Sequence, residues 1–236
     1  MTKIPPYLSK GDTIGLVAPA GFMPEENFQQ SIQTIREWGF RVLPGKTPGH
    51  QFHYFSGTDE ERKTDLQNML DDPQIKAILC VRGGYGTGRI IDQLDFRKFK
   101  KNPKWVIGFS DITVLHNHIF SNFNIATLHA PMSAAFNEGE YQNEFVQSLR
   151  KALTGRKGNY KTLAHPFNHY GNAQGTLVGG NLALLTHLIG TRSDINTRNK
   201  ILFIEDIGEY IYNVDRMMIQ LKRSGKLDQL NGLIIG

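Results

Sequence analysis

The fold of this chain is most readily predicted from one short stretch, Trp105-Val106-Ile107-Gly108-Phe109-Ser110-Asp111. Its first three residues are apolar, which is typical of the end of a buried strand, and Gly108 permits a sharp reversal of the backbone. Apolar residues at helical spacing follow at once, at Ile112, Leu115, Ile119 and Phe120. We therefore expect a strand, a tight turn with Ser110 at its tip, and a helix.

This order of elements is typical of a nucleophile elbow, which exposes the serine oxygen. The backbone N–H of the next residue, Asp111, then faces the place where an attacked carbonyl would gain negative charge, so the suggested chemistry is acyl transfer. The usual pattern is Gly-x-Ser-x-Gly, whereas here Asp111-Ile112 replaces the final x-Gly. A turn in which Ser110 or Asp111 simply caps a helix is the alternative interpretation.

Strand and helix patterns alternate on both sides of this stretch. Apolar runs typical of strands occur at residues 11–19, 76–81 and 125–128. Between them, Phe28, Ile32 and Ile35 recur at helical spacing, and Thr58 with Glu61 resembles a capping box that opens a second helix. Such alternation predicts an α/β fold with an open, mostly parallel sheet flanked by helices, whose ligands bind beyond the carboxyl ends of the strands.

A second unit follows a change of composition. Residues 155–175 are rich in Gly, Asn, Lys, Pro and His with little periodicity, and a strand pattern at 201–204 then leads to Glu205 and Asp206. We predict a nucleophile-bearing domain at 1–155, a linker at 156–175 and a C-terminal domain at 176–236. Because the chain stops in an apolar, strand-like run at 231–236, we expect this second domain to be incomplete.

Composition places the chain among globular proteins. It has 236 residues, of which 39% are hydrophobic, enough for a sizeable core. No apolar run resembles a signal peptide or reaches the roughly 18 residues of a membrane span. The single cysteine, Cys80, lies inside a predicted strand, excludes an internal disulfide and fits a reducing compartment. We expect a cytoplasmic protein with no membrane partner.

The charge of the chain does not identify a partner. Its 27 Lys and Arg against 22 Asp and Glu give a net charge of +5, and the densest basic cluster is at 97–101. No aromatic platform or repeated basic face accompanies that cluster. A solvated surface segment is therefore favoured over a nucleic-acid site.

A glycine-rich turn, Arg82-Gly83-Gly84-Tyr85-Gly86-Thr87-Gly88-Arg89, follows the predicted strand at 76–81. Nucleotide-binding patterns fail here, because Arg89-Ile90 stands where a P-loop needs Lys-Ser/Thr and no glycine completes Gly-x-Gly-x-x-Gly. Gly83 and Gly84 could instead bring backbone N–H groups to a substrate oxygen, together with that of Asp111. A simple tight turn is the alternative.

A serine nucleophile needs a general base, normally a histidine oriented by a carboxylate. Glu205, at the end of a predicted buried strand, suits the orienting role, although it could merely cap a segment near Gly208. Of the eight histidines, His129 alone directly follows a predicted sheet strand. No spacing of His, Cys or acidic residues indicates a metal, and we expect no cofactor.

Six motifs in order resemble the LD-carboxypeptidase family of serine peptidases, which includes the microcin C immunity peptidases. These motifs span most of the chain and comprise Gly15–Ala20, Arg82–Gly86, Gly108–Asp111, His129–Met132, Gly179–Leu182 and Ile204–Asp206. The resemblance implies Ser110 as nucleophile, Glu205 as triad glutamate, and an oxyanion hole from Asp111 and the Gly83-Gly84 turn. It implies release of a terminal D-amino acid from a muropeptide, a small peptide substrate, by cleavage of an L,D bond.

One departure from the family pattern stands out. The family histidine lies in a Gly-His motif beyond the glutamate, yet no histidine follows His187 here. We therefore expect the 236-residue chain to lack its base and to be nearly inactive. A peptidase that cleaves a peptidyl-nucleotide antibiotic and a non-catalytic ligand-binding relative remain alternatives. A homodimer is one expectation for the quaternary state, which the sequence does not determine.

Overall fold

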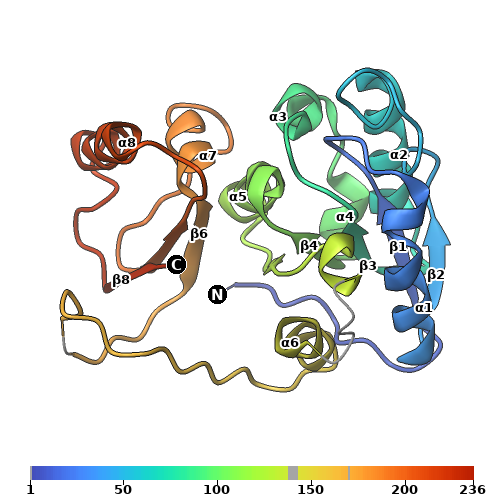
Figure 1. Ribbon diagram of the computed structural model, residues 1–236, viewed down its shortest axis with the longest axis horizontal. Coiled ribbons are helices and arrows are strands. Elements are labelled where there is room, and N and C mark those ends of the chain that lie inside the picture. The colour runs from blue at the N-terminus through green and yellow to red at the C-terminus, as the bar shows by residue number, and fades with distance from the viewer. Residues whose placement is uncertain (1, 138–142, 170) are drawn as a thin grey trace.

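A five-stranded parallel sheet forms the centre of the first part of the protein (Figure 1). The computed structural model describes residues 2–137, 143–169 and 171–236. Strand order is β2-β1-β3-β4-β5, with bounds β1 Thr13–Val17, β2 Arg41–Pro44, β3 Ile75–Cys80, β4 Trp105–Gly108 and β5 Leu128–His129. This order has its switch point between β1 and β3, where ligands of such folds bind. The predicted α/β class is confirmed.

Helices cover both faces of this sheet. They are α1 Gln29–Glu37, α2 Asp59–Asp71, α3 Thr87–Ile90, α4 Arg97–Lys101, α5 Thr113–Phe123 and α6 Glu144–Leu153, with short 3-10 turns at Glu25–Asn27, Ile91–Gln93, Ser110–Ile112 and Ser133–Phe136. Within β3, Ala77 and Leu79 pack in the core cluster of α1 and α6, whereas Ile78 and Cys80 pack in that of α2, α4 and α5. Burial on both faces explains why this strand is apolar apart from the exposed Lys76 near its start.

Two local signals in the sequence are confirmed. Thr58 accepts a hydrogen bond from the Glu61 N–H, and the Glu61 carboxylate accepts one from the Thr58 N–H, which is the capping box that opens α2. Cys80 is fully buried in β3, as expected for a core residue.

A second, three-stranded parallel sheet has the order β6-β7-β8 and lies beside α5 (Figure 1). Its elements are β6 Leu177–Asn181, α7 Leu182–His187, β7 Ile201–Glu205, α8 Ile211–Arg223 and β8 Gly232–Ile235. Between α6 and β6, the described residues contain no helix or strand, and this segment crosses the lower edge of the view in Figure 1. The division into 1–155, 156–175 and 176–236 stays a prediction.

Three elements differ from expectation. Strand β2 was not predicted, because it is a short edge strand with mostly exposed residues and ends in a proline. The predicted strand at 125–128 is instead β5 at Leu128–His129, and Ile125 only bridges to Lys3. In β6, Gly179 and Gly180 lie within the strand, since a Cβ on Gly179 would fall 1.8 Å from the Phe203 carbonyl oxygen of β7.

Candidate active site

Ser110 sits at the tip of the predicted elbow, between β4 and α5. Its φ is +60°, a left-handed conformation that is uncommon for a residue with a side chain and is often found at active sites. Gly108 has a φ of +159°, and a Cβ there would lie 2.9 Å from the Ile112 side chain. Ile112 is thus tolerated where the usual pattern has glycine because position 108 carries no side chain. Ser110 remains partly exposed.

The glycine turn packs directly against the elbow. A Cβ on Gly83 would lie 3.1 Å from the Ser110 Cβ and 3.3 Å from the Asp111 nitrogen. Gly84 has a φ of +96°, which favours glycine. The structure therefore brings Gly83, Gly84, Ser110 and Asp111 together at the carboxyl edge of β3 and β4.

The Asp111 carboxylate does not cap its own helix. It is buried and accepts a hydrogen bond of 2.8 Å from the backbone N–H of Thr87. Burial raises the pKa of Asp111, while the hydrogen bonds from Thr87 and the charge of Arg62 oppose that shift. Asp111 therefore does not cap the helix that follows it; its carboxylate instead accepts the N–H of Thr87, the first residue of α3.

Glu205 is the last residue of β7. The ring of Phe203, two residues earlier in the same strand, lies 5.1 Å from that of His129, measured between ring centroids. The His129 ring in turn lies 6.0 Å from that of Phe109, the neighbour of Ser110. These ring contacts join β7, the strand that carries Glu205, to the elbow that carries Ser110.

The Glu205 carboxylate is not used as a helix cap. Its Oε1 is buried with no hydrogen-bond partner among the described residues. Burial, and secondarily the charge of Asp206, raises the pKa of Glu205, and the Asn181 side chain partly opposes this. Asp206 serves as the local cap instead, accepting hydrogen bonds from the Asn181 side chain and from the Ala183 and Ile207 N–H groups. The capping alternative thus applies to Asp206.

No histidine within the described part of the chain forms a hydrogen bond with Ser110. His116 is buried in α5, where its Nε2 pairs with the Gly108 carbonyl at 2.9 Å, and burial lowers its pKa to about 4. His118 pairs with Ser193. Burial likewise lowers the pKa of His129 to about 4, and His129 is the histidine that packs against Phe109.

The two arginines that flank the glycine turn have different surroundings. Arg89 is engaged with both Asp59 carboxylate oxygens, at 2.9 and 3.0 Å from its Nε. Arg82 is exposed, lies along Gly21, and donates one hydrogen bond to the Phe22 carbonyl. Among the described residues, the Arg82 guanidinium makes no other hydrogen bond, so it has donors to offer a ligand beside the Gly83-Gly84 turn.

A third arginine in this region was missed in the sequence. Arg62 is fully buried, and its guanidinium donates to the carbonyls of Pro19, Gly57 and Gly86. The spacing in the sequence could have indicated its burial, because Arg62 lies four residues before Leu66 on the apolar stripe of α2. An arginine on a buried stripe must find several acceptors, which indicates a structural or positioning role.

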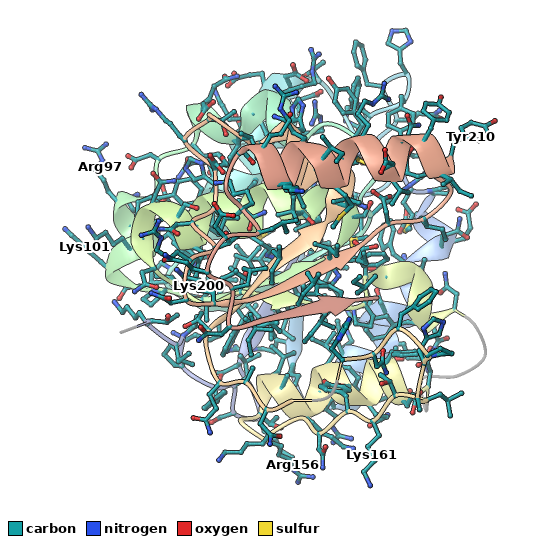
Figure 2. The ribbon with its side chains drawn as sticks, turned by 90° about the vertical axis from the view of Figure 1, so that its left-hand side faces the viewer. Arg97, Lys101, Arg156, Lys161, Lys200 and Tyr210 are labelled. Atoms are coloured by element: carbon teal, nitrogen blue, oxygen red, sulfur yellow. The ribbon has the colours of Figure 1, made fainter. Side chains whose placement is uncertain are left out.

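The surface beyond this site carries dispersed charge. Arg97 and Lys101 of α4, and Arg156 and Lys161 of the segment after α6, point outward from the molecule (Figure 2). Among the described residues, no group of three or more His, Cys, Asp or Glu side chains is suited to a metal ion. Within the same residues, no helix is both long and apolar enough to cross a membrane.

Comparison with known proteins identifies the family. The family model described as LD-carboxypeptidase N-terminal domain matches residues 14–130, and the one described as LD-carboxypeptidase C-terminal domain matches residues 174–236. A Bacillus subtilis protein named "Probable murein peptide carboxypeptidase" is 40% identical over 98% of this chain and 73% of its own length. The Escherichia coli "Microcin C7 self-immunity protein MccF" is 28% identical over 97% of this chain and 76% of its own length.

Solved structures agree with this match. The muramoyltetrapeptide carboxypeptidase of Oxalobacter formigenes superposes with a TM-score of 0.86 and 31% identity, covering 95% of this chain and 76% of that protein. The chain belongs to the LD-carboxypeptidase family of serine-type peptidases.

Proposed function

We propose that this protein removes the terminal D-amino acid from a murein peptide by hydrolysing an L,D peptide bond. Family membership and the names of its relatives support a carboxypeptidase that acts on murein peptides. The observation that carries the site assignment is Ser110 at a φ of +60°, with Gly83 packed against it and against the Asp111 N–H. Peptidoglycan recycling in the cytoplasm is the corresponding biological role.

In the proposed mechanism, Ser110 Oγ attacks the carbonyl carbon of the scissile bond and passes its proton to a histidine base. Negative charge on the carbonyl oxygen is stabilised by N–H groups of Asp111 and the Gly83-Gly84 turn. The C–N bond then breaks, the base returns its proton to the departing amine, and the D-amino acid leaves. Water, deprotonated by the same base, hydrolyses the acyl-enzyme and regenerates Ser110.

Glu205 is proposed to orient that base. A carboxylate that binds the second ring nitrogen of the histidine holds the correct tautomer and stabilises the imidazolium that forms. The buried Oε1 of Glu205, which has no partner among the described residues, is an acceptor of the required kind. Burial raises its pKa, as expected for a carboxylate whose Asn181 hydrogen bond does not fully offset the cost of desolvation.

None of the eight histidines is proposed as the base. His116 and His118 are committed to Gly108 and Ser193, and His129 has aromatic neighbours. We therefore propose that the 236-residue chain alone is nearly inactive, since loss of a triad base typically costs several orders of magnitude in kcat. Measuring its turnover of a murein tetrapeptide tests this. Turnover at an ordinary enzymatic rate would contradict it.

The nucleophile is tested with a fluorophosphonate probe and a tetrapeptide that ends in D-alanine. The active enzyme should be labelled at Ser110. It should release D-alanine from this peptide, but should not release L-alanine from the epimeric peptide. The Ser110→Ala variant should lose labelling and on the order of 10⁶-fold in kcat. An unlabelled Ser110 with intact peptide binding would favour the non-catalytic relative.

Cleavage of a peptidyl-nucleotide is the second candidate, favoured by the similarity to the self-immunity protein. Both activities use the same nucleophile, so the substrate distinguishes them. Hydrolysis of a peptidyl-nucleotide faster than of a murein tetrapeptide would select this alternative. The homodimer and the domain boundaries at 1–155, 156–175 and 176–236 stay predictions.

A further inference from the structure

We infer that the Asp111 side chain is a positioning group that aligns the two halves of the oxyanion hole. Its backbone N–H is one proposed donor, and its carboxylate holds the turn that supplies the other. This inference rests on the proposed function, because it concerns the same site. It assigns a role to a side chain that the nucleophile-elbow pattern leaves unspecified.

The glycine turn needs contacts that fix its conformation, because its glycines allow the backbone many φ and ψ values. Gly83, Gly84 and Gly86 occur within four residues, and the φ values of Gly84 and Gly86 are +96° and +140°. Glycines in such a loop can adopt many conformations, so an N–H group on it points at the substrate only if the ends are held. Preorganised donors are what makes an oxyanion hole effective.

Three contacts hold this turn. The Gly83 carbonyl accepts from the Gly21 N–H at 3.0 Å, which fixes the start of the turn to the loop after β1. The Gly86 carbonyl accepts from buried Arg62 of α2 at 3.1 Å. The Thr87 N–H donates to Asp111 Oδ2 at 2.8 Å.

Only the third of these contacts connects the turn to the element that carries Ser110. Asp111 is 2% exposed and Thr87 is fully buried, so this hydrogen bond is shielded from water. Without the carboxylate, the Thr87 N–H would lose its acceptor in a buried position, which is unfavourable. The turn would then no longer be held to the elbow by this hydrogen bond.

The test compares Asp111→Ala with Asp111→Asn in the active enzyme. Alanine removes the acceptor, whereas the asparagine side-chain oxygen can still accept the Thr87 N–H. Asp65→Ala is the matched control, since Asp65 is also a buried carboxylate that accepts backbone N–H groups, those of Lys46 and Thr47. Each variant is measured for kcat, KM, and affinity for a peptide boronate that forms a tetrahedral adduct with serine.

Asp111→Ala should lower kcat by about 10²-fold, comparable to the loss of one oxyanion donor, with KM within about threefold. Boronate affinity should fall in parallel, while Asp111→Asn should recover most of both. Asp65→Ala should lower the melting temperature without changing kcat. Hydrogen exchange of the amides at 83–87, measured on folded protein, should accelerate in Asp111→Ala and not in Asp65→Ala.

Unchanged kcat and unchanged exchange in Asp111→Ala would overturn the inference, as would an Asp111→Asn variant as impaired as Asp111→Ala. Ser110→Ala separates this failure from failure of the proposed function. If Ser110→Ala is inactive while Asp111→Ala is normal, only the positioning role is wrong. If Ser110→Ala keeps its activity, the proposed function itself is wrong.

Discussion

Thr113 Oγ1 accepts a hydrogen bond from the backbone N–H of Asn181 at 3.1 Å, and this buried contact joins the nucleophile helix to the second sheet. The approach is close, since a Cβ on Gly180 would fall 2.6 Å from the same oxygen. Asn181 pairs in register with Glu205 on the neighbouring strand. The placement of Glu205 relative to Ser110 therefore depends on this junction.

Removing the acceptor at Thr113 should weaken both stability and catalysis. Thr113→Val leaves the buried Asn181 N–H unpaired, at a cost of about 1–3 kcal/mol in the free energy of unfolding. A shift of the second sheet by about 1 Å should also lower kcat by up to about 10²-fold. Urea denaturation and steady-state kinetics check this. Thr113→Ser keeps the hydroxyl and should behave as wild type, and a fully active Thr113→Val would argue against the junction's role.

A methyl group at Gly83 should disrupt the oxyanion hole. The new Cβ would lie 3.1 Å from the Ser110 Cβ and 3.3 Å from the Asp111 nitrogen, so it would push apart the groups that bind the developing charge. We expect Gly83→Ala to lower kcat by about 10²-fold with little change in KM. Gly88→Ala in the same turn is the control, because nothing lies within 4 Å of its Cβ position. Similar kinetics for the two variants would refute the assignment.

The acidic residues that end β7 should have separable roles. Glu205→Gln keeps the shape of the side chain but removes the charge that orients the base, so kcat should fall by about 10³- to 10⁴-fold at unchanged stability. Asp206→Asn should instead lower the melting temperature, because Asp206 accepts the Ala183 N–H at the start of α7. Thermal melts and kinetics on both variants check this pair, and the reverse pattern would reassign the triad carboxylate.

Arg82 should contribute to substrate binding. Murein peptides end in a carboxylate, and the exposed Arg82 guanidinium, which makes a single hydrogen bond among the described residues, can pair with it. Arg82→Ala should raise KM about tenfold for a free-acid peptide and leave KM unchanged for its C-terminal amide. Arg89→Ala, whose guanidinium is held by Asp59, should not change KM. An equal effect of Arg82→Ala on both peptides would place its partner elsewhere in the substrate.

His116 should make the fold sensitive to acid. Its pKa in the folded protein is lowered from 6.5 to about 4, so between these pH values the unfolded chain binds the proton and the folded one does not. The contribution of His116 to the free energy of unfolding is complete above pH 6.5 and falls as the pH drops below it. At pH 5 this group has lowered the free energy of unfolding by about 2 kcal/mol. The His116→Gln side chain can still donate to the Gly108 carbonyl but does not titrate. Between pH 7 and pH 5, the free energy of unfolding of this variant should therefore fall by about 2 kcal/mol less than that of the wild type. Urea midpoints at the two pH values measure the difference.

Local patterns were sufficient for most elements of the first sheet and for the elbow. Apolar runs marked β1, β3 and β4, and Thr58 with Glu61 marked the start of α2, because these signals depend on residues close together in the chain. The order Gly108, Ser110 and Asp111 likewise indicated the turn. Strand β2 was missed because its residues are mostly exposed and carry no alternation.

Tertiary structure decided the partners of the side chains. Which of Glu205 and Asp206 caps a helix depends on the position of α7, and the acceptors of Arg62 come from three loops far apart in the sequence. Asp111 could have capped its own helix, yet it binds Thr87, which the packing of β3 against β4 brings close. Periodicity reports which residues are apolar and how they repeat, whereas the choice among several acceptors is made only when distant segments pack and exclude water.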